Sequence, residues 1–240
     1  MPAPRIQILP DHSEQFVQTF APKPDPVQEE MTTVADARGD RFPGEGSFPT
    51  VGQTVGGWLY QQARQSGIDR VFEFGSGFGY SAYWLARALT ADGEIVLTER
   101  DRDELGLARE FMERGEFQAT IQFEHGDAQS IFEQSTGDYD LVMLDHKNDE
   151  YPAAFDAVAD RLSDGGLLVA DNVMTAAIIE TETLLAGLQD GELSDEANVH
   201  TQGVYEYLQT VRSDQRFATR LVPIGGGLAV SRLESGATEK

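Results

Sequence analysis

The segment VFEFGSGFGYS, residues 71–81, decides the fold. An apolar run that suits a buried strand leads directly into three glycines at alternate positions, Gly75, Gly77 and Gly79. Glycine allows a tight turn and lets the backbone approach a ligand closely. A helix expected from Ser81 onward would present free N–H groups beside this turn, where an anionic group could bind. The segment therefore predicts a strand, a ligand-binding turn and a helix, in that order.

Strands and helices alternate along the chain on both sides of this segment. Short apolar runs predict strands at 70–74, 94–98, 119–124, 139–144, 166–170, 217–223 and 228–232. Periodic apolar positions predict helices at 51–66, 81–89, 101–114, 128–134, 151–162, 176–188 and 204–213. Three glycines at 225–227 join the last two strands, which is typical of a hairpin. The sequence thus predicts an α/β fold with a doubly wound, mostly parallel seven-stranded sheet and a C-terminal antiparallel hairpin.

The first 46 residues differ in composition from the rest. Eight of the ten prolines lie within the first 49 residues, so we expect 1–46 to form an arm of short helical pieces, either a poorly ordered tail or a lid. Residues 47–234 are expected to form one domain and 235–240 a tail. No apolar run approaches the roughly 18 residues of a membrane span, and the N-terminus lacks the apolar core of a signal peptide. We therefore expect a cytoplasmic protein without membrane contact.

The chain carries 41 acidic and 18 basic side chains, a formal net charge of −23, and three of the basic residues are lysines. Such a charge opposes electrostatic binding to nucleic acids and to anionic membranes. An acid-rich, lysine-poor composition is typical of proteins in high salt, where repulsion between carboxylates is screened. We therefore expect a halophilic source, with a merely acidic mesophilic protein as the alternative. Because the chain has no cysteine, disulfides, thiolate metal sites and cysteine nucleophiles are excluded.

Polar side chains follow three neighbouring strands of the expected sheet, where each strand ends. Glu73 lies at the end of the first strand, and Glu99 ends the second, 24 residues after Gly75. A carboxylate at that second position can accept hydrogen bonds from the ribose hydroxyls of an adenosine. After the third strand, Asp127 or Gln129 could contact an adenine edge. Any one of these acids alone could be a solvated loop residue, but together they predict a ligand that contains adenosine.

Two further carboxylates follow the next two strands. Asp145 ends the fourth strand, and Asp171 with Asn172 ends the fifth. Because parallel strands end at the same edge of a sheet, we expect these three side chains to lie close together. Carboxylate and amide oxygens, completed by waters, suit Mg²⁺, Mn²⁺ or Ca²⁺ rather than zinc. The alternative is that Asp171 caps the next helix and Asp145 is structural.

Lys147 stands beside this predicted cation site in a chain that has almost no lysine. A lysine next to a divalent cation could act as a base. Alternatively, it is a surface lysine that pairs with one of the many nearby acids. His146 could pack against the cofactor or have a structural role. We predict Lys147 and Asp145 as the catalytic residues.

These motifs together resemble the class I S-adenosylmethionine-dependent O-methyltransferases, and most closely the cation-dependent catechol and caffeoyl-CoA branch. The resemblance rests on VFEFGSGFGYSA (71–82), LTERD (97–101), GDAQ (126–129), DLVMLDHKNDEY (140–151), GGLLVADNV (165–173) and LVPIGGGLAV (221–230). It extends over residues 48–232, which is most of the chain. It implies a Rossmann-like methyltransferase fold, S-adenosyl-L-methionine as the cofactor, and Mg²⁺ or another divalent cation.

The resemblance also implies roles for single residues. The glycine turn would hold the methionine part of the cofactor, with Ser81 near its carboxylate, and Glu99 would bind the ribose. Ala128 and Gln129 would flank adenine. The cofactor-binding residues predicted from the motifs and the resemblance together are Val51, Glu73, Gly75, Gly77, Gly79, Ser81, Glu99, Asp127, Ala128, Gln129 and His146. The residues implied for the cation are Asp145, Asp171 and Asn172.

Two positions depart from the family pattern. The family's catalytic lysine lies three residues after the first metal-binding aspartate, and that position is Asn148 here. The lysine of this chain stands one position earlier, at Lys147. Either a small shift of the loop lets Lys147 take the role, or the cation alone acidifies the substrate. In the final hairpin, Gly226 stands where many relatives have aspartate.

Residues and resemblance together predict an S-adenosylmethionine-dependent O-methyltransferase that methylates a hydroxyl of a small catechol-like or phenolic acceptor, assisted by a divalent cation. One alternative is an NAD-dependent oxidoreductase, against which Tyr80 in the glycine motif and the Asp171–Asn172 pair argue. The other is a non-catalytic protein that binds an adenosine ligand, which Asn148 alone supports. A homodimer is compatible with the resemblance, and the charge does not favour a nucleic-acid substrate.

Overall fold

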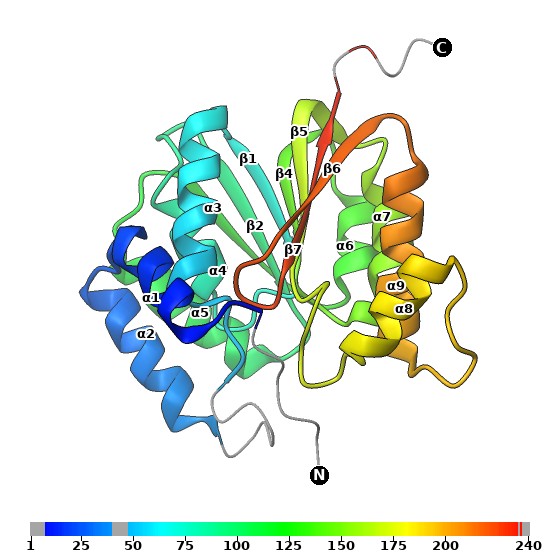
Figure 1. Ribbon diagram of the computed structural model, residues 1–240. Helices are drawn as coiled ribbons and strands as arrows, with labels where there is room; N and C mark the ends of the chain where they lie inside the picture. The colour runs from blue at the N-terminus through cyan, green and yellow to red at the C-terminus, as the bar shows by residue number, and fades with distance from the viewer. Residues whose placement is uncertain (1–7, 40–47, 235, 237–240) are drawn as a thin grey trace.

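The computed structural model describes residues 8–39, 48–234 and 236, which build one seven-stranded sheet with the order β3-β2-β1-β4-β5-β7-β6 (Figure 1). Strands β1 to β5 are parallel, and β7 runs antiparallel between β5 and β6. The predicted fold is therefore confirmed. The strands are β1 (Arg70–Phe74), β2 (Glu94–Glu99), β3 (Thr120–His125), β4 (Tyr139–Leu144), β5 (Leu162–Ala170), β6 (Phe217–Val222) and β7 (Leu228–Leu233).

Helices cover both faces of the sheet, which gives three layers (Figure 1). One face carries α3 (Gly52–Ser66), α4 (Tyr80–Ala86) and α5 (Arg102–Arg114). The other carries α6 (Ala128–Gln134), α7 (Tyr151–Val158) and α9 (Val199–Ser213), with α8 (Thr181–Asp190) against α9 and the short 3₁₀ turn η2 (Asn148–Glu150) before α7. None of the described helices is long and apolar enough to cross a membrane.

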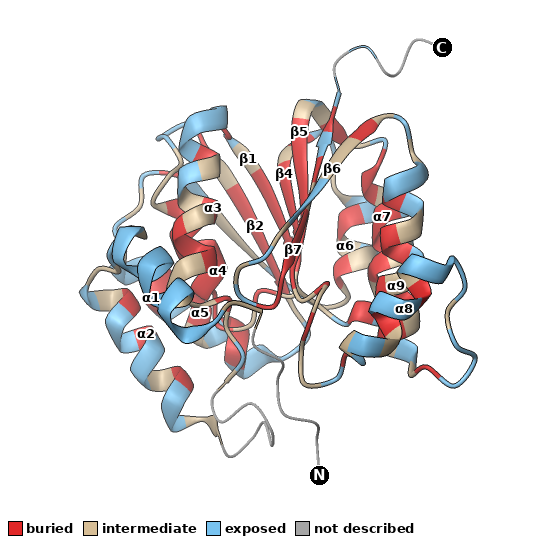
Figure 2. Ribbon diagram, viewed as in Figure 1, coloured by how far each residue is buried: buried red, intermediate tan, exposed pale blue. Residues whose placement is uncertain are grey.

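The central strands β1 and β4 are apolar on both faces because each face is covered by helices. Side chains alternate along a strand, so the two faces build two cores (Figure 2). Phe72 and Leu144 belong to the core beneath α6, α7 and α9. Val71 and Met143 belong to the core beneath α3, α4 and α5. Glu73 occupies a fully buried position of β1, so a carboxyl group stands where the pattern calls for an apolar side chain.

The described part of the predicted arm contains two helices, α1 (Asp11–Phe20) and α2 (Pro26–Ala37). Asp25 caps α2 and also accepts a hydrogen bond from the Tyr83 hydroxyl of α4 at 3.0 Å. α2 buries Met31 against the core. Residues 8–39 are thus docked on the domain. Residues 1–7 and 40–47 of the predicted arm, and 235 and 237–240 of the predicted tail, lie outside the described residues.

Several predicted boundaries are wrong. The helix expected at 204–213 begins five residues earlier, at Val199, where the Asn198 side chain caps it, and the helix expected at 81–89 ends at Ala86. The helix expected at 176–188 begins at Thr181, so residues 176–180 form a loop. The helix expected at 151–162 ends at Val158, because Leu162 pairs with Tyr139 and starts β5 four residues before the predicted strand. An irregularity in the β4–β5 pairing follows this point, and Gly165 there has a φ of +75°. Periodicity alone could not find a strand that begins with such an irregularity.

Candidate functional site

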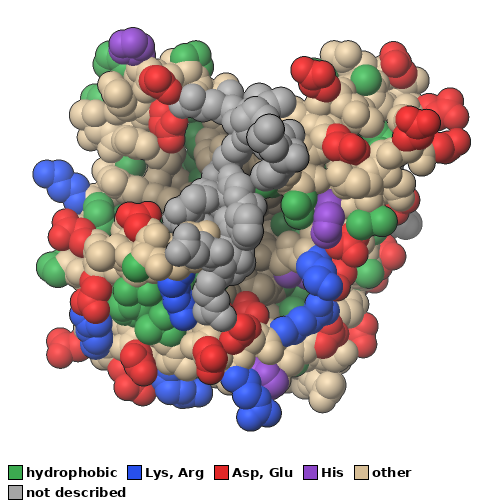
Figure 3. Space-filling model, turned by 90° about the horizontal axis from the view of Figure 1, so that it is seen from below, with side chains coloured by type: hydrophobic (Ala, Val, Ile, Leu, Met, Phe, Trp, Pro, Cys, Tyr) green, Lys and Arg blue, Asp and Glu red, His purple; other side chains and the backbone are tan. Residues whose placement is uncertain are grey.

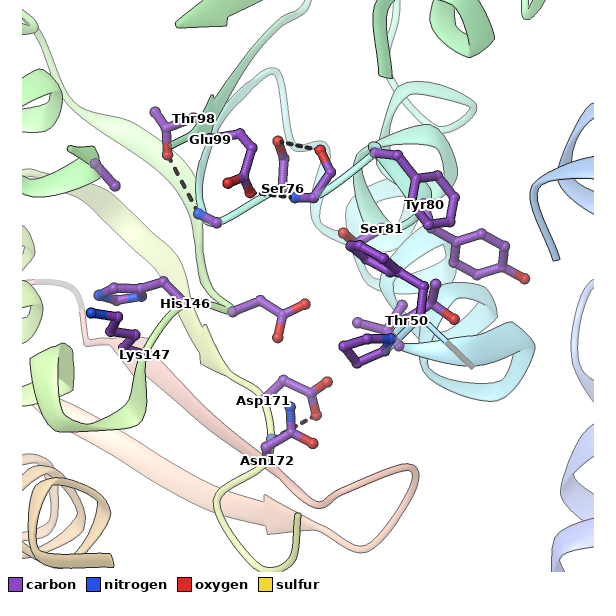
Figure 4. A pocket seen from close by; sticks show the side chains of 18 of the residues that line it. Thr50, Ser76, Tyr80, Ser81, Thr98, Glu99, His146, Lys147, Asp171 and Asn172 are labelled. Carbon is purple, nitrogen blue, oxygen red and sulfur yellow. Dashed lines mark hydrogen bonds between the residues drawn. The ribbon is translucent and has the colours of Figure 1, made fainter. Parts of the chain in front are cut away.

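A cavity of about 610 Å³ lies where the parallel strands end. Its wall is made by short segments that follow one another around the edge of the sheet: 48–51, 75–78, 80–81, 98–100, 126 and 128, 145–148, 171–172 and 176–178. Figure 4 shows Glu99 and Ser76 on one side of this cavity and Asp171 with Asn172 on another. The structure therefore brings most of the predicted site residues together in one pocket.

The glycine turn is folded tightly against the end of β4. Gly75, Gly77 and Gly79 have φ values of +81°, +51° and +85°, which residues other than glycine rarely adopt. A Cβ atom on Gly75 would also lie 2.7 Å from the carbonyl oxygen of Asp145. The turn thus needs glycine for its conformation and for the close approach to the neighbouring strand end. Gly75 and Gly77 line the pocket, whereas Gly79 does not.

Glu99 organises the pocket wall at the end of β2. Its carboxylate accepts hydrogen bonds from the backbone N–H groups of Gly77 at 2.9 Å, Arg100 at 2.7 Å and Asp101 at 2.9 Å. These bonds hold the carboxylate at the cavity, in the position from which a ribose could be bound. The predicted contact with a ribose stays a prediction.

Glu73 and Ser81 form a buried pair behind the glycine turn. The Ser81 hydroxyl donates a hydrogen bond to Oε1 of Glu73, while Oε2 has no partner among the described residues. Burial raises the pKa of Glu73 to about 7, and the nearby Glu99 acts in the same direction against the Ser81 hydrogen bond. Ser81 lines the pocket, whereas Glu73 lies behind it.

Asp145 and Asp171 form the acidic floor of the pocket, at the ends of β4 and β5, with Asp171 buried and Asp145 partly buried. Burial raises the pKa of Asp145 well above its usual range, and the nearby carboxyl of Asp171 adds to the shift. Asp171 accepts a hydrogen bond from the Asn172 N–H at 2.7 Å. The next described helix begins ten residues later, at Thr181, so Asp171 does not cap it.

The donor set at this floor fits a hard divalent cation. The part of the chain that the structure describes contains no group of three or more His, Cys, Asp and Glu side chains arranged for a metal. It does place the buried carboxyl of Asp171 and the partly buried carboxyl of Asp145 at the cavity wall together with the amide of Asn172. Figure 4 shows Asp171 beside Asn172. Two carboxyls that oppose each other's ionisation would both ionise beside a dication. Oxygen donors of this kind, completed by waters, suit Mg²⁺ or Mn²⁺.

The hairpin turn between β6 and β7 packs against the segment that begins with Asn172. The N–H groups of Val173, Met174 and Thr175 donate to the carbonyl oxygens of Gly226 and Gly227 at 2.9–3.1 Å. A Cβ on Gly226 would lie 2.1 Å from Oδ1 of Asn172. Asn172 itself has a φ of +57°, which asparagine tolerates better than most residues. The glycine run in the sequence was the available signal for this contact, which motif reasoning alone did not find.

Lys147 and Asn148 both line the pocket but in different ways. The Lys147 side chain is 63% exposed, and its ammonium lies 3.9 Å from the carboxylate of Glu150. Figure 4 shows Lys147 next to His146 and directed away from Asp171. Asn148 is buried. The surface pairing of Lys147 that the sequence left open is thus present.

The residues predicted for adenine are only partly gathered at the pocket. His146 and Ala128 line it, and burial with the nearby Arg100 lowers the pKa of His146 to about 4. Asp127 caps α6, and its ion pair with Arg100 lowers its pKa to about 2. Gln129 donates a hydrogen bond to Glu133. Asp127 and Gln129 do not line the cavity.

Several wall residues were missed by sequence reasoning. Phe48 stacks edge-on against Phe78 with ring centroids 4.9 Å apart, and its N–H bonds to Ala35 at the end of α2. Val51, which was predicted, lines the pocket beside it. The loop at 176–178 provides Ala176, Ala177 and Ile178, three apolar residues that the sequence had placed in a helix. These segments give the pocket an apolar side opposite the acidic floor.

Comparisons with known proteins show to which family the chain belongs. The family model for O-methyltransferase matches residues 46–233. A catechol O-methyltransferase of Niastella koreensis is 28% identical over 129 residues, 52% of this chain and 58% of that protein, so the match spans little more than half of that relative. Caffeoyl-CoA O-methyltransferase 3 of Nicotiana tabacum is 23% identical over 76% of both chains. The structure of an O-methyltransferase from Bacillus cereus in complex with SAH superposes with a TM-score of 0.76 at 21% identity, over 93% of this chain and 97% of that one. The chain belongs to the O-methyltransferase family.

Proposed function

We propose that this protein transfers the methyl group of S-adenosyl-L-methionine to a hydroxyl of a small catechol-like or phenolic acceptor, assisted by a divalent cation. The observation that carries the proposal is the pair of carboxyls Asp145 and Asp171, partly buried and buried, in the same pocket as the glycine turn and Glu99. The family match supports methyl transfer to oxygen. The SAH complex of the Bacillus cereus protein supports the cofactor.

The chain's own residues would bind and orient the cofactor. The turn at Gly75–Gly77 offers backbone at close range, and the Glu99 carboxylate faces the same space as an acceptor for ribose hydroxyls. His146, held neutral by burial, gives a flat surface of low polarity beside Ala128. The methyl group of the cofactor is reactive because it is bonded to a sulfonium sulfur. The attacking hydroxyl oxygen must approach it nearly in line with the carbon–sulfur bond. Positioning is therefore the main task of this wall.

The acidic floor and the apolar side define the acceptor that fits. Asp145, Asp171 and Asn172 would hold the cation, which supplies Lewis acidity to a bound hydroxyl. Phe48 and the 176–178 loop supply apolar contacts for a ring. Such a pocket favours a small aromatic molecule with neighbouring hydroxyls. The net charge of −23 supports a small acceptor over a nucleic acid.

The direct test measures transfer of tritiated methyl from S-adenosylmethionine to catechol in high-salt buffer with Mg²⁺. We expect transfer with wild type, none after EDTA, and recovery when Mg²⁺ is added back. Asp171→Asn should lower kcat by at least ~100-fold while keeping S-adenosylhomocysteine binding by calorimetry. Full activity in EDTA would remove the cation from the proposal but leave the transferase.

The same assays, with NAD added as a second ligand in calorimetry, separate the two alternative functions. An NAD-dependent oxidoreductase would bind NAD in calorimetry and leave S-adenosylhomocysteine unbound. A non-catalytic adenosine-ligand protein would bind S-adenosylhomocysteine but methylate none of a panel of phenols and catechols. The family match and the paired carboxyls favour neither of these.

A further inference from the structure

The hydroxyl of Tyr151 joins the ends of the two strands that carry the acidic pair. It donates to the carbonyl oxygen of Leu144, the last residue of β4, at 3.1 Å. It also donates to the carbonyl oxygen of Asp171, directly after β5, at 3.0 Å. The single hydroxyl proton is shared between the two carbonyls, so both are drawn toward one point.

This contact lies just beyond the last paired residues of the two strands. Leu144 pairs with Ala170 in the β4–β5 ladder, and the N–H of Asp171 adds one further bond to the Leu144 carbonyl at 3.0 Å. Asp145 follows Leu144 directly, and Asp171 is itself the residue whose carbonyl oxygen accepts the second bond. The Tyr151 hydroxyl therefore fixes the backbone at the two positions that carry the carboxylates.

The Tyr151 ring is held on both sides, which leaves the hydroxyl little freedom. The ring is fully buried and packs between His146 and Tyr207, with ring centroids 5.3 and 5.7 Å away. The Asn148 side chain lies close enough to the same hydroxyl to lower its pKa, against the effect of burial. Asn148, at the position of the family's lysine, thus supports the Tyr151 hydroxyl. Tyr151 itself is the first residue of α7 and lies behind the pocket wall.

We propose that Tyr151 is a positioning residue that sets the separation of the Asp145 and Asp171 carboxylates for a divalent cation. The inference rests on the proposed function, because it assumes that these carboxylates bind a cation. Tyr151 does not line the pocket, so it acts through the backbone of the two strand ends. Groups that orient metal ligands from behind typically change metal affinity 10–100-fold when they are removed.

The test is Tyr151→Phe, which removes one oxygen and keeps the ring. Mn²⁺ binding is measured by electron paramagnetic resonance on the ligand-free protein, and S-adenosylhomocysteine binding by calorimetry. We expect the Kd for Mn²⁺ to rise at least ~10-fold. The Kd for S-adenosylhomocysteine should change less than about twofold, because Tyr151 does not line the pocket and the variant keeps the ring that packs against His146. A merely structural role would lower the melting temperature without this selective loss.

The matched control is Tyr139→Phe. Tyr139 is equally buried at the opposite end of β4, and its hydroxyl has no partner among the described residues. The Tyr139→Phe variant should bind Mn²⁺ with the same Kd as wild type. If Tyr151→Phe does not fold, Asn148→Leu removes the support from the same hydroxyl, and we expect it to weaken Mn²⁺ binding in the same direction.

Each outcome has a distinct meaning. Wild-type affinity for Mn²⁺ in a folded Tyr151→Phe, or in Asn148→Leu where the first variant is unfolded, overturns the positioning role and leaves the proposed function intact. An equal loss in Tyr139→Phe also overturns it, because the effect would then follow from any lost buried hydroxyl. If wild type binds no Mn²⁺, the cation part of the proposed function fails, and the positioning role falls with it.

Discussion

The Ser81 hydroxyl donates a hydrogen bond to one carboxyl oxygen of Glu73, and the other oxygen has no partner among the described residues. A buried carboxylate with an unpaired oxygen is costly, whereas a protonated carboxyl in the same place is not. This explains why burial raises the pKa of Glu73 to about 7. The protein therefore folds around a group that changes its charge near neutral pH.

The stability of the ligand-free protein should depend on Glu73 between pH 4.5 and 7. In this range the folded state holds a proton that the unfolded state has lost, so the free energy of unfolding falls as pH rises. A shift from 4.5 to about 7 corresponds to a loss of about 3 kcal/mol. Glu73→Gln stays neutral and should gain that much relative to wild type between pH 4.5 and 7.5. Urea unfolding at several pH values measures it, and parallel pH profiles for the two proteins would refute it.

Gly226→Ala should weaken cation binding more than cofactor binding. The new Cβ would lie 2.1 Å from Oδ1 of Asn172 and 2.7 Å from the Thr175 carbonyl, so the amide must move away. We expect overpacking to cost about 1–3 kcal/mol of stability and the Mn²⁺ affinity to fall at least ~10-fold. Gly106→Ala is the matched control, because a Cβ there meets nothing within 4 Å on helix α5. The idea is wrong if both variants bind Mn²⁺ equally well.

Lys147→Met tests whether Lys147 is the base. Its ammonium is exposed and faces Glu150, so we expect kcat for methyl transfer to fall less than ~10-fold. Positioned bases contribute roughly 10²–10⁴-fold, so a loss above 100-fold would show that Lys147 turns into the pocket and takes the catalytic role. Glu150→Gln serves as the control, because it frees Lys147 without removing its charge.

The melting temperature should rise with KCl if the acidic composition reflects a saline habitat. Figure 3 shows Asp and Glu side chains spread across the face of the molecule at the pocket rather than gathered in one patch. Screening of this repulsion should raise the melting temperature by at least ~5 °C between 0.1 and 3 M KCl, about 2 kcal/mol for a domain of this size. Sucrose, which is excluded from the protein surface but does not screen charge, should raise the melting temperature less. An unchanged melting temperature in KCl would count against a halophilic source.

The fold could be predicted well because its signals are local. The strand Tyr139–Leu144 and the helix Ala128–Gln134 have the predicted bounds, since an apolar run of strand length and an Asp127 cap define them. The parallel pairing of β1 to β5 follows from strands that alternate with helices. The acids at strand ends could be found for the same reason, because the ends of parallel strands converge.

The parts that escaped prediction depend on contacts between distant segments. Tyr151 looked like an ordinary helix residue, because its hydroxyl contacts carbonyls of two strands rather than its neighbours in sequence. Asp127 looked available for a ligand, but Arg100 and the first turn of α6 take its oxygens. The 176–180 loop looked helical because it is rich in apolar residues, but residues 176–178 line the pocket and Ile179 belongs to the core.

The position of β7 between β5 and β6 has a consequence for synthesis of the chain. The glycine turn that bonds to residues 173–175 and abuts Asn172 lies between β6 and β7, far along the sequence from the other pocket segments. During translation, the part of the pocket wall at 75–100 can form early. The segment at 171–175 lacks its contacts with the final hairpin until residues 225–233 leave the ribosome. The active site is therefore completed last, and a nascent protein should acquire cofactor affinity before it acquires cation affinity.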